Sequence, residues 1–140
     1  MKAFRALAQF DARSIASSGL GISDFAVLEI LLHKGPLPVN TIGRQVMLTS
    51  GSISAAVDRL EKKQFLARQA CPKDRRVTHV ALTAAGRTLI RRVFKTHAGQ
   101  LETVFEPLST GERAALATLL KKLGKQAESL LQPGKQEFRS

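Results

Sequence analysis

Apolar side chains recur at helical spacing, three or four residues apart, along most of this sequence. The pattern is clearest over residues 23–34, where one face carries Phe25, Leu28, Leu31 and Leu32. Ser23 is a suitable N-cap for this helix, and the glycine and proline that follow Lys34 end it. A weaker pattern over residues 3–17 predicts a first helix, which the segment SSGLG interrupts.

Two short helices are predicted next, separated by a tight turn at MLTS; the first ends near Met47 and the second near Lys63. Their candidate caps are Asn40 or Thr41 for the first and Thr49 or Ser50 for the second. The second helix has an apolar stripe of Ile53, Val57 and Leu60, opposite a small or polar side of Gly51, Ala55, Asp58 and Lys62, flanked by Ser54 and Arg59. A helix, a tight turn and a helix that starts with small hydroxyl residues allow the second helix to enter a DNA major groove.

A basic hairpin is predicted after these helices. The segments FLARQA and VTHVALT alternate between apolar and polar positions, are rich in strand-forming residues, and are joined by CPKDRR. A minor groove is narrow and strongly negative, so a hairpin that crosses it needs a cation near its tip. We expect Asp74 to orient Arg76, because residues two apart share a strand face. Arg75 and Lys73 then remain for contacts with phosphates.

Two long amphipathic helices are predicted at the end of the chain. The first covers residues 83–106, is capped by Thr83 and stops before Pro107, and the second opens at a capping box of Ser109 and Glu112. Their apolar positions are Leu89, Ile90, Val93, Phe94, Leu101, Val104 and Phe105 in the first and Leu116, Leu119, Leu120, Leu123, Ala127, Leu130 and Leu131 in the second. This is more apolar surface than a small winged module covers by itself, so we expect dimerisation.

Charge narrows the class of partner. The 140-residue chain has a formal net charge of +11, and eleven of its 22 lysines and arginines fall in residues 58–95. Such an excess favours an acidic partner, either nucleic acid or an anionic membrane. No membrane span is expected, because the longest apolar block, FAVLEILL, is short and contains Glu29. A single cysteine, Cys71, and an N-terminus without a signal-peptide pattern predict a cytoplasmic protein.

The segment from Leu48 to Gly86, LTSGSISAAVDRLEKKQFLARQACPKDRRVTHVALTAAG, resembles the recognition helix and wing of the MarR family of winged helix-turn-helix regulators. The resemblance rests on an Asp-x-Arg motif in the wing and on the Leu-Thr-x-x-Gly continuation. The segment SDFAVLEILLHKGPLPVNTIG is similar to the family's second helix, short first strand and third helix.

The resemblance implies a mainly α fold with a small β-hairpin, in which a winged helix-turn-helix is combined with N- and C-terminal dimerisation helices. We expect one domain over residues 1–140. Its expected parts are a DNA-binding region over residues 23–83, helical dimerisation regions over residues 1–18 and 84–131, and a polar tail over residues 132–140.

The resemblance also implies a function. It predicts a sequence-specific transcriptional regulator that binds double-stranded DNA as a homodimer on a pseudo-palindromic operator. It further implies a repressor that responds to a small, often aromatic or phenolic, effector. The motif carries the wing pair over to Asp74 and Arg76, and places Arg59 at a position that is more often structural or phosphate-contacting. The predicted DNA-binding residues are Thr49, Ser50, Ser52, Ser54, Ala55, Arg59, Lys73, Asp74, Arg75 and Arg76.

Three features depart from the family pattern. Ala55 stands where relatives often carry a larger polar or basic residue, so we expect fewer base contacts there. Gln64 replaces the usual helix-ending glycine, and a left-handed backbone at this position costs about 1 kcal/mol. The first helix starts late, which predicts a smaller dimer interface than is typical.

Other interpretations remain open at the level of sequence. Phosphate neutralisation alone would give a sequence-indifferent architectural DNA-binding protein, and a winged helix also docks other proteins. The basic run is alternatively a solvated face, and the serines are alternatively caps. Cys71 invites a redox interpretation, and the three histidines, His33, His79 and His97, invite a metal interpretation, but neither has the neighbouring residues that such a site needs.

No enzyme is expected. The sequence contains no Walker A motif, no HExxH, no G-x-S-x-G and no dinucleotide-binding fingerprint. We therefore assign no catalytic residue, no metal ligand and no cofactor from the sequence.

Overall fold

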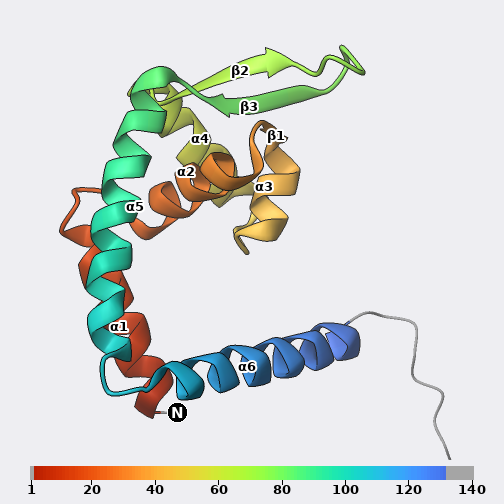
Figure 1. The fold of residues 1–140 in the computed structure, drawn as a ribbon. Coiled ribbons are helices and arrows are strands. Elements are labelled where there is room, and N and C mark those ends of the chain that lie inside the picture. The colour runs from red at the N-terminus through yellow and green to blue at the C-terminus, as the bar shows by residue number, and fades with distance from the viewer. Residues whose placement is uncertain (1, 132–140) are drawn as a thin grey trace, which may run out of the picture. The chain divides into compact units, whose positions relative to one another are not determined.

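The computed structural model describes residues 2–131, so the predicted polar tail over residues 132–140 lies outside the described residues. The elements in chain order are α1 (Lys2–Ala16), α2 (Ile22–Lys34), β1 (Leu37–Pro38), α3 (Val39–Gln45), α4 (Ser50–Lys62), β2 (Leu66–Ala70), β3 (Thr78–Leu82), α5 (Ala84–Phe105) and α6 (Thr110–Leu131) (Figure 1). The chain forms two compact units, one ending at Leu101 and the other beginning at Glu102.

A small antiparallel sheet lies in the first unit. Its strand order is β1-β3-β2, so the hairpin strand β3 is central. Val80 on β3 is opposite Leu37 of β1 on one side and Arg68 of β2 on the other. Alternation along the sequence predicted the β2–β3 hairpin, and the resemblance implied the short first strand. Both are present, and β2 and β3 run out beyond the helices as a wing (Figure 1).

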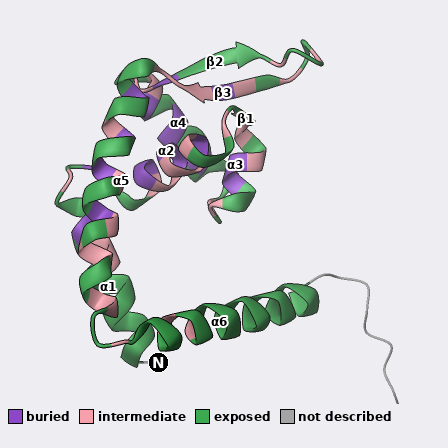
Figure 2. Cartoon of the chain, viewed as in Figure 1, coloured by how far each residue is buried: buried purple, intermediate pink, exposed green. Residues whose placement is uncertain are grey.

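The core of this unit lies where α2, α3, α4 and α5 meet the sheet. Figure 2 shows the buried residues gathered on the inward sides of α2 and α4. The largest fully buried side chains are Leu28, Leu31, Ile42, Leu60, Ile90, Val27, Val57 and Val80. The apolar stripe predicted for the fourth helix is confirmed, because Ile53, Val57 and Leu60 are all buried. Burial of one side of α4 leaves its other side free to face a partner.

Two predicted N-caps are wrong. The second helix begins at Ile22 and is preceded by Gly21, whose carbonyl accepts the Phe25 N–H at 2.9 Å, so Ser23 already lies inside the first turn. The third helix begins at Val39, directly after β1, with Pro38 at the N-cap. Pro38 is extended, pairs with His79, and leads straight into the helix, so no residue is left over to act as a side-chain cap. Asn40 and Thr41 therefore lie within the helix.

Three other predicted caps are confirmed. Thr49 accepts the Ser52 backbone N–H at 3.2 Å, and Thr83 accepts the Gly86 N–H at 3.0 Å. The capping box is formed in both directions, since the Ser109 N–H donates to Glu112 at 2.8 Å and the Glu112 N–H donates to Ser109 at 3.2 Å. These local hydrogen bonds set the starts of α4, α5 and α6.

The second unit contains the end of α5 and the whole of α6. Arg113 joins them, because its guanidinium donates to the Phe105 and Leu108 carbonyls and binds Glu102 at 2.8 Å. None of the residues of α6 is buried. The exposed large apolar residues on this helix are Leu119, Leu120, Leu123, Leu130 and Leu131. The second unit therefore presents an apolar stripe that its own residues leave uncovered.

None of the described helices combines the length and the apolar character needed to cross a membrane.

Candidate nucleic-acid interface

The outward face of α4 is small and polar. Ser50, Ser52, Ser54 and Ala55 are all exposed, while the opposite side of the helix is buried in the core. The Thr49 hydroxyl donates to Ser52 at 2.9 Å and accepts the Ser52 N–H, so it fixes the first turn of the helix. Short side chains on this face keep the helix axis close to whatever the face contacts. A helix with these properties fits the width of a major groove.

The turn between α3 and α4 brings the two helices unusually close. A Cβ added to Gly43 would lie 3.1 Å from Cγ2 of Ile53, so only a glycine fits this crossing without a shift. The Leu48 N–H donates to the Gly43 carbonyl at 2.9 Å, and Met47 between them has a left-handed φ of 57°. These contacts hold α4 at a defined angle to α3, as a helix-turn-helix requires.

The tip of the wing contains an oriented arginine. Asp74 accepts the Arg76 backbone N–H at 3.0 Å and the Arg76 Nε at 3.1 Å. The expected pair is therefore formed, but through a turn between the strands and not through a shared strand face, because β2 ends at Ala70 and β3 starts at Thr78. Hydrogen bonds from the Arg76 side chain and backbone hold the pKa of Asp74 below its usual value.

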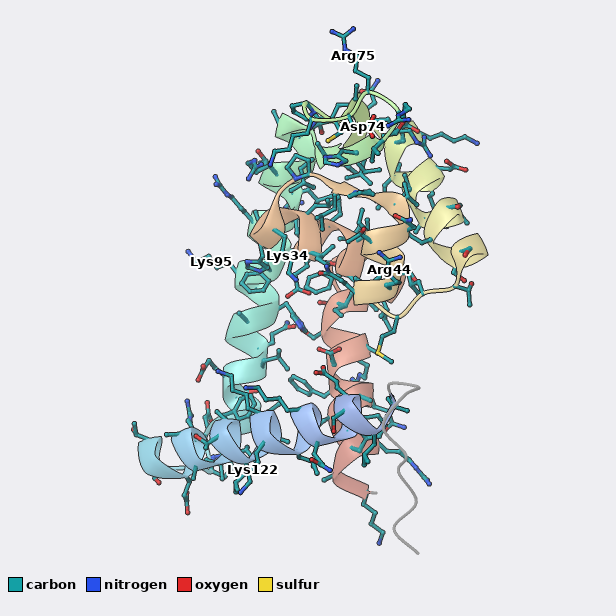
Figure 3. All side chains as sticks on the ribbon, turned by 90° about the vertical axis from the view of Figure 1, so that its right-hand side faces the viewer. Lys34, Arg44, Asp74, Arg75, Lys95 and Lys122 are labelled. Carbon is teal, nitrogen blue, oxygen red and sulfur yellow. The ribbon has the colours of Figure 1, made fainter. Side chains whose placement is uncertain are left out.

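Arg76 nevertheless remains available to a partner, with 91% of its side chain exposed. Arg75 and Lys73 are also exposed, and neither has an ion-pair partner among residues 2–131. Figure 3 shows Arg75 projecting from the end of the wing, with Asp74 set back from it. The tip therefore presents one held arginine and two unpaired cations.

Arg59 differs from the other predicted contact residues. Its guanidinium binds the buried carboxylate of Asp24 on α2, with Nε 3.2 Å from Oδ1 and 3.1 Å from Oδ2 and with Nη2 also on Oδ1. Hydrogen bonding and charge attraction from Asp24 raise the pKa of Arg59. The structure thus places Arg59 in a contact within the protein, consistent with the structural alternative that its sequence position left open.

Sequence reasoning did not single out Arg68. This β2 residue binds Asp58 at 2.9 Å and also Glu61, both on α4, and the two acidic residues raise its pKa. The bond ties the wing to the recognition helix and offsets negative charge beside the outward face. The spacing of two carboxylates three residues apart on one helix was the available signal, but it does not say which cation they meet.

Arg44, at the end of α3, was also not singled out. It is exposed and donates to Thr41 at 3.4 Å (Figure 3). In a helix-turn-helix the first helix crosses the DNA backbone, so a cation here is suitably placed for a phosphate.

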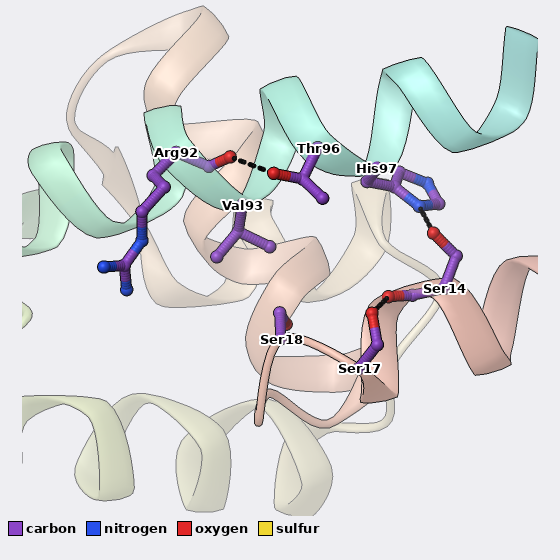
Figure 4. Close-up of a pocket in the computed structure, with 7 residues that line it drawn as sticks. All are labelled: Ser14, Ser17, Ser18, Arg92, Val93, Thr96 and His97. Atoms are coloured by element: carbon purple, nitrogen blue, oxygen red, sulfur yellow. Dashed lines mark hydrogen bonds between the residues drawn. The ribbon is translucent and has the colours of Figure 1, made fainter.

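A cavity of about 290 Å³ lies away from this face, between the end of α1 and the middle of α5 (Figure 4). It is lined by Ser14, Ser17, Ser18, Arg92, Val93, Thr96 and His97. His97 is buried, with Nδ1 2.8 Å from the Ser14 hydroxyl and Nε2 3.1 Å from Asp11. Arg92 has no ion-pair partner among the described residues. Hydroxyls, an imidazole and an open guanidinium can hold a small polar or anionic molecule.

Within residues 2–131 there is no group of three or more His, Cys, Asp or Glu side chains arranged to hold a metal ion. Cys71 is a free, half-buried thiol whose backbone N–H donates to Val77 at 2.9 Å at the base of the wing tip. His33 packs edge-on against Phe94, with 5.0 Å between ring centroids. These residues have packing contacts that account for their positions.

Comparisons with known proteins agree with this geometry. The sequence model described as the MarR family matches residues 20–78. The HTH-type transcriptional regulator MhqR of Bacillus subtilis (strain 168) is 39% identical over 127 residues, which are 91% of this chain and 88% of that protein.

Solved structures have the same fold. A probable transcriptional regulator from Pseudomonas aeruginosa is 31% identical with a TM-score of 0.73, over 86% of this chain and 93% of that one. A structure of Bordetella bronchiseptica BpsR, described as explaining regulation of its DNA binding by 6-hydroxynicotinic acid, is 25% identical with a TM-score of 0.74 over 88% of each chain. Because a relative of 39% identity spans nearly the whole chain and the family model matches its helix-turn-helix, this protein belongs to the MarR family of transcriptional regulators.

Proposed function

We propose that this protein is a cytoplasmic repressor that binds a pseudo-palindromic operator as a homodimer and releases it when a small ligand binds. The observation that carries the proposal is the pairing of a small polar face on α4 with a cationic wing tip in the same unit. One element has the shape for a major groove, and the other has the charge for a minor groove.

In the proposed complex the two α4 helices enter successive major grooves about 34 Å apart. Ser50, Ser52 and Ser54 face the bases, and the small side chain of Ala55 allows close approach. Arg76, held by Asp74, enters the flanking minor groove, because a planar and weakly hydrated guanidinium suits a narrow negative groove. Lys73, Arg75 and Arg44 bind phosphates.

Two apolar surfaces support a dimer. Phe4, Leu7 and Phe10 on α1 are exposed, and so is the leucine stripe of α6. Such stripes are costly in water, and a second copy of the chain would cover them. Two winged units held together in this way would contact two half-sites at once, which is the source of high operator affinity in a dimeric regulator.

The cavity between α1 and α5 supports ligand control. Arg92 supplies a cation for a carboxylate or phenolate, and the serine hydroxyls and His97 supply hydrogen bonds. A small aromatic acid or phenol fits this chemistry, as the regulation of BpsR by 6-hydroxynicotinic acid illustrates for that protein. A ligand there would change the angle between the dimerising helices and the winged unit, and would weaken both half-sites together.

The alternative is a sequence-indifferent architectural DNA binder. Its support is the net charge of +11, which gives salt-sensitive association with any duplex. A specific regulator instead prefers its operator over random DNA by about 10³-fold or more at physiological salt.

Selection of genome fragments decides between the two. Purified full-length protein is mixed with sheared genomic DNA of its source at physiological salt, and the retained fragments are sequenced. We expect enrichment of one inverted repeat with half-site centres about ten base pairs apart. Retention without a shared motif would establish the architectural function in its place.

The ligand part has its own test. The protein is bound to the selected repeat and titrated with 6-hydroxynicotinic acid and a panel of phenols and aromatic acids. We expect at least one compound to release the DNA, and Arg92→Met to weaken that release more than Arg91→Met, its neighbour outside the cavity lining. Equal effects of the two variants would argue against the cavity as the ligand site.

A further inference from the structure

Asp24 is the only buried carboxylate among residues 2–131, with 4% of the residue exposed. It lies in the first turn of α2, where the free backbone N–H groups of a helix start favour a negative charge. A buried charge is costly unless a partner compensates it, and here the partner is Arg59, 35 positions later on the recognition helix. The pair therefore joins the core of the unit to the element that faces DNA.

The geometry of the pair restricts α4. Arg59 engages both carboxylate oxygens through Nε and also reaches Asp24 through Nη2. A planar fork on a carboxylate fixes direction as well as distance, which a single ammonium contact does not. Its partner cannot move freely, because Asp24 is enclosed and its neighbour Phe25 packs edge-on against His97, with 5.1 Å between ring centroids.

Arg59 also lies in line with the outward face of α4. Ser52, Ala55 and Arg59 follow one another at spacings of three and four residues, so they share one stripe of the helix. A bond at the end of that stripe sets how far the whole stripe is turned. With a helix radius of about 5–6 Å including side chains, a rotation of about 10° moves the side chains by about 1 Å. Such a shift is enough to misplace hydrogen bonds to base edges.

We propose that Arg59 is a positioning residue: its fork on Asp24 sets the rotation of α4 on α2 and thereby the alignment of the serine face with the bases. The proposal rests on the proposed function of α4 as the base-contacting helix. The alternative is that Arg59 contacts a phosphate, with Asp24 as an incidental neighbour. About half of the Arg59 side chain is exposed, so both roles are sterically open and need to be separated by experiment.

Asp24→Asn separates them by sign. If Arg59 is a phosphate contact, removing the neighbouring negative charge frees the guanidinium and tightens binding to any duplex, with a steeper salt dependence. If Arg59 positions α4, the same change lets the helix turn. Binding to the selected repeat then weakens by about fivefold or more, the scale of one mismatched base pair, while binding to random DNA stays unchanged.

Arg59→Lys gives the matching result from the other side. Lysine keeps the positive charge that a phosphate needs but loses the fork, so the positioning role predicts weaker specific binding and an unchanged salt slope. Lys62→Ala, which removes an exposed cation from the same helix, is the control for a simple loss of charge. The double variant Asp24→Asn/Arg59→Lys should bind no more weakly than the weaker single variant, because both changes remove one contact.

All variants are first compared by circular dichroism and thermal unfolding, and binding is measured well below the lowest Tm. A direct readout then needs no DNA: residual dipolar couplings of the α2 and α4 amides in the full chain report the angle between the helices. We expect α4 to be reoriented in Asp24→Asn and not in Lys62→Ala.

Unchanged couplings, or tighter binding to every duplex in Asp24→Asn, would overturn the positioning role. Failure of the proposed function appears separately, as the absence of any enriched repeat in the genome selection. In that event the dipolar couplings still decide whether the pair orients α4.

Discussion

At the scale of single residues, Met47 and Gln64 adopt a backbone that normally selects glycine. Their φ angles are 57° and 62°, and each follows the end of a short helix. At Gln64 the Phe65 N–H reaches back to the Leu60 carbonyl at 3.0 Å, which is the hydrogen bond that closes a left-handed helix end. The missing glycine in the sequence raised this possibility for Gln64, and the backbone confirms it. Nothing local singled out Met47.

Gln64→Gly should stabilise the protein by about 1 kcal/mol, because glycine adopts a positive φ without the steric cost of a Cβ. Urea unfolding of the two proteins measures the difference. Lys63→Gly is the control, since Lys63 has a φ of −79° and gains nothing from glycine. It should destabilise the protein by about 0.5 kcal/mol through the greater freedom of the unfolded chain. Equal effects at both positions would mean that strain at Gln64 is absent.

Gly86 has a packing requirement instead of a backbone one. A Cβ at this position would overlap the carbonyl oxygen of Phe65, where the start of α5 crosses the entry to the wing. The Phe65 carbonyl also accepts the Thr83 N–H at 3.1 Å, so it has little freedom to move. The Leu-Thr-x-x-Gly continuation in the sequence therefore marks a point where two backbones meet.

Gly86→Ala should lower the free energy of unfolding by about 2 kcal/mol or more, because backbone must shift to admit the methyl group. Gly99→Ala is a matched change in the same helix, and nothing lies within 4 Å of the added atom. It should raise stability by up to about 1 kcal/mol through helix propensity. Thermal unfolding with circular dichroism compares the pair, and a harmless Gly86→Ala would contradict the close approach.

At the scale of elements, the wing combines a local and a distant arrangement. Asp74 and Arg76 are two residues apart, and their pairing was predictable from the sequence. The attachment of the wing to α4 through Arg68 was not, because Asp58 and Glu61 lie ten and seven positions away on another element. The resulting hairpin is held at its base by Arg68 and carries its cations at the tip.

The two wing arginines should behave differently in binding to the selected repeat. Arg76→Ala should weaken binding and relax the preference for A·T-rich flanks, because an arginine held in a narrow groove senses groove width. Arg75→Ala should mainly reduce the salt dependence, by about 0.9 in slope for each of two phosphate contacts. Fluorescence anisotropy at several salt concentrations measures both. The reverse pattern would show that the roles of the two arginines are exchanged.

At the scale of the whole molecule, uncovered apolar surface is the main feature left by the fold of one chain. Neither the leucines of α6 nor Phe4, Leu7 and Phe10 of α1 are buried by the described residues. Helical periodicity predicted the leucine stripe and its width. It could not say whether another part of the same chain would cover it.

Leu120→Glu should convert the proposed dimer into monomers and lower operator affinity by at least about 100-fold, because both half-sites must then be bound independently. Light scattering gives the mass, and the selected repeat gives the affinity. Lys125→Glu introduces the same residue on the opposite side of α6 and should leave the dimer intact. A monomeric wild-type protein, or a dimer that survives Leu120→Glu, would contradict the assignment of this surface.

The sequence by itself determined the features that depend on neighbours along the chain: helical and strand periodicity, the caps at Thr49, Thr83 and Ser109, and the charged wing tip. Tertiary structure decided the long-range partners, because spacing along a chain does not specify which distant groups meet. Arg59 was predicted on the DNA-facing side and is held by Asp24, 35 positions away. His97 meets Ser14 across 83 positions beside a cavity that no local pattern indicated. Burial creates these pairings, since an enclosed charge or hydroxyl must find its partner within the fold.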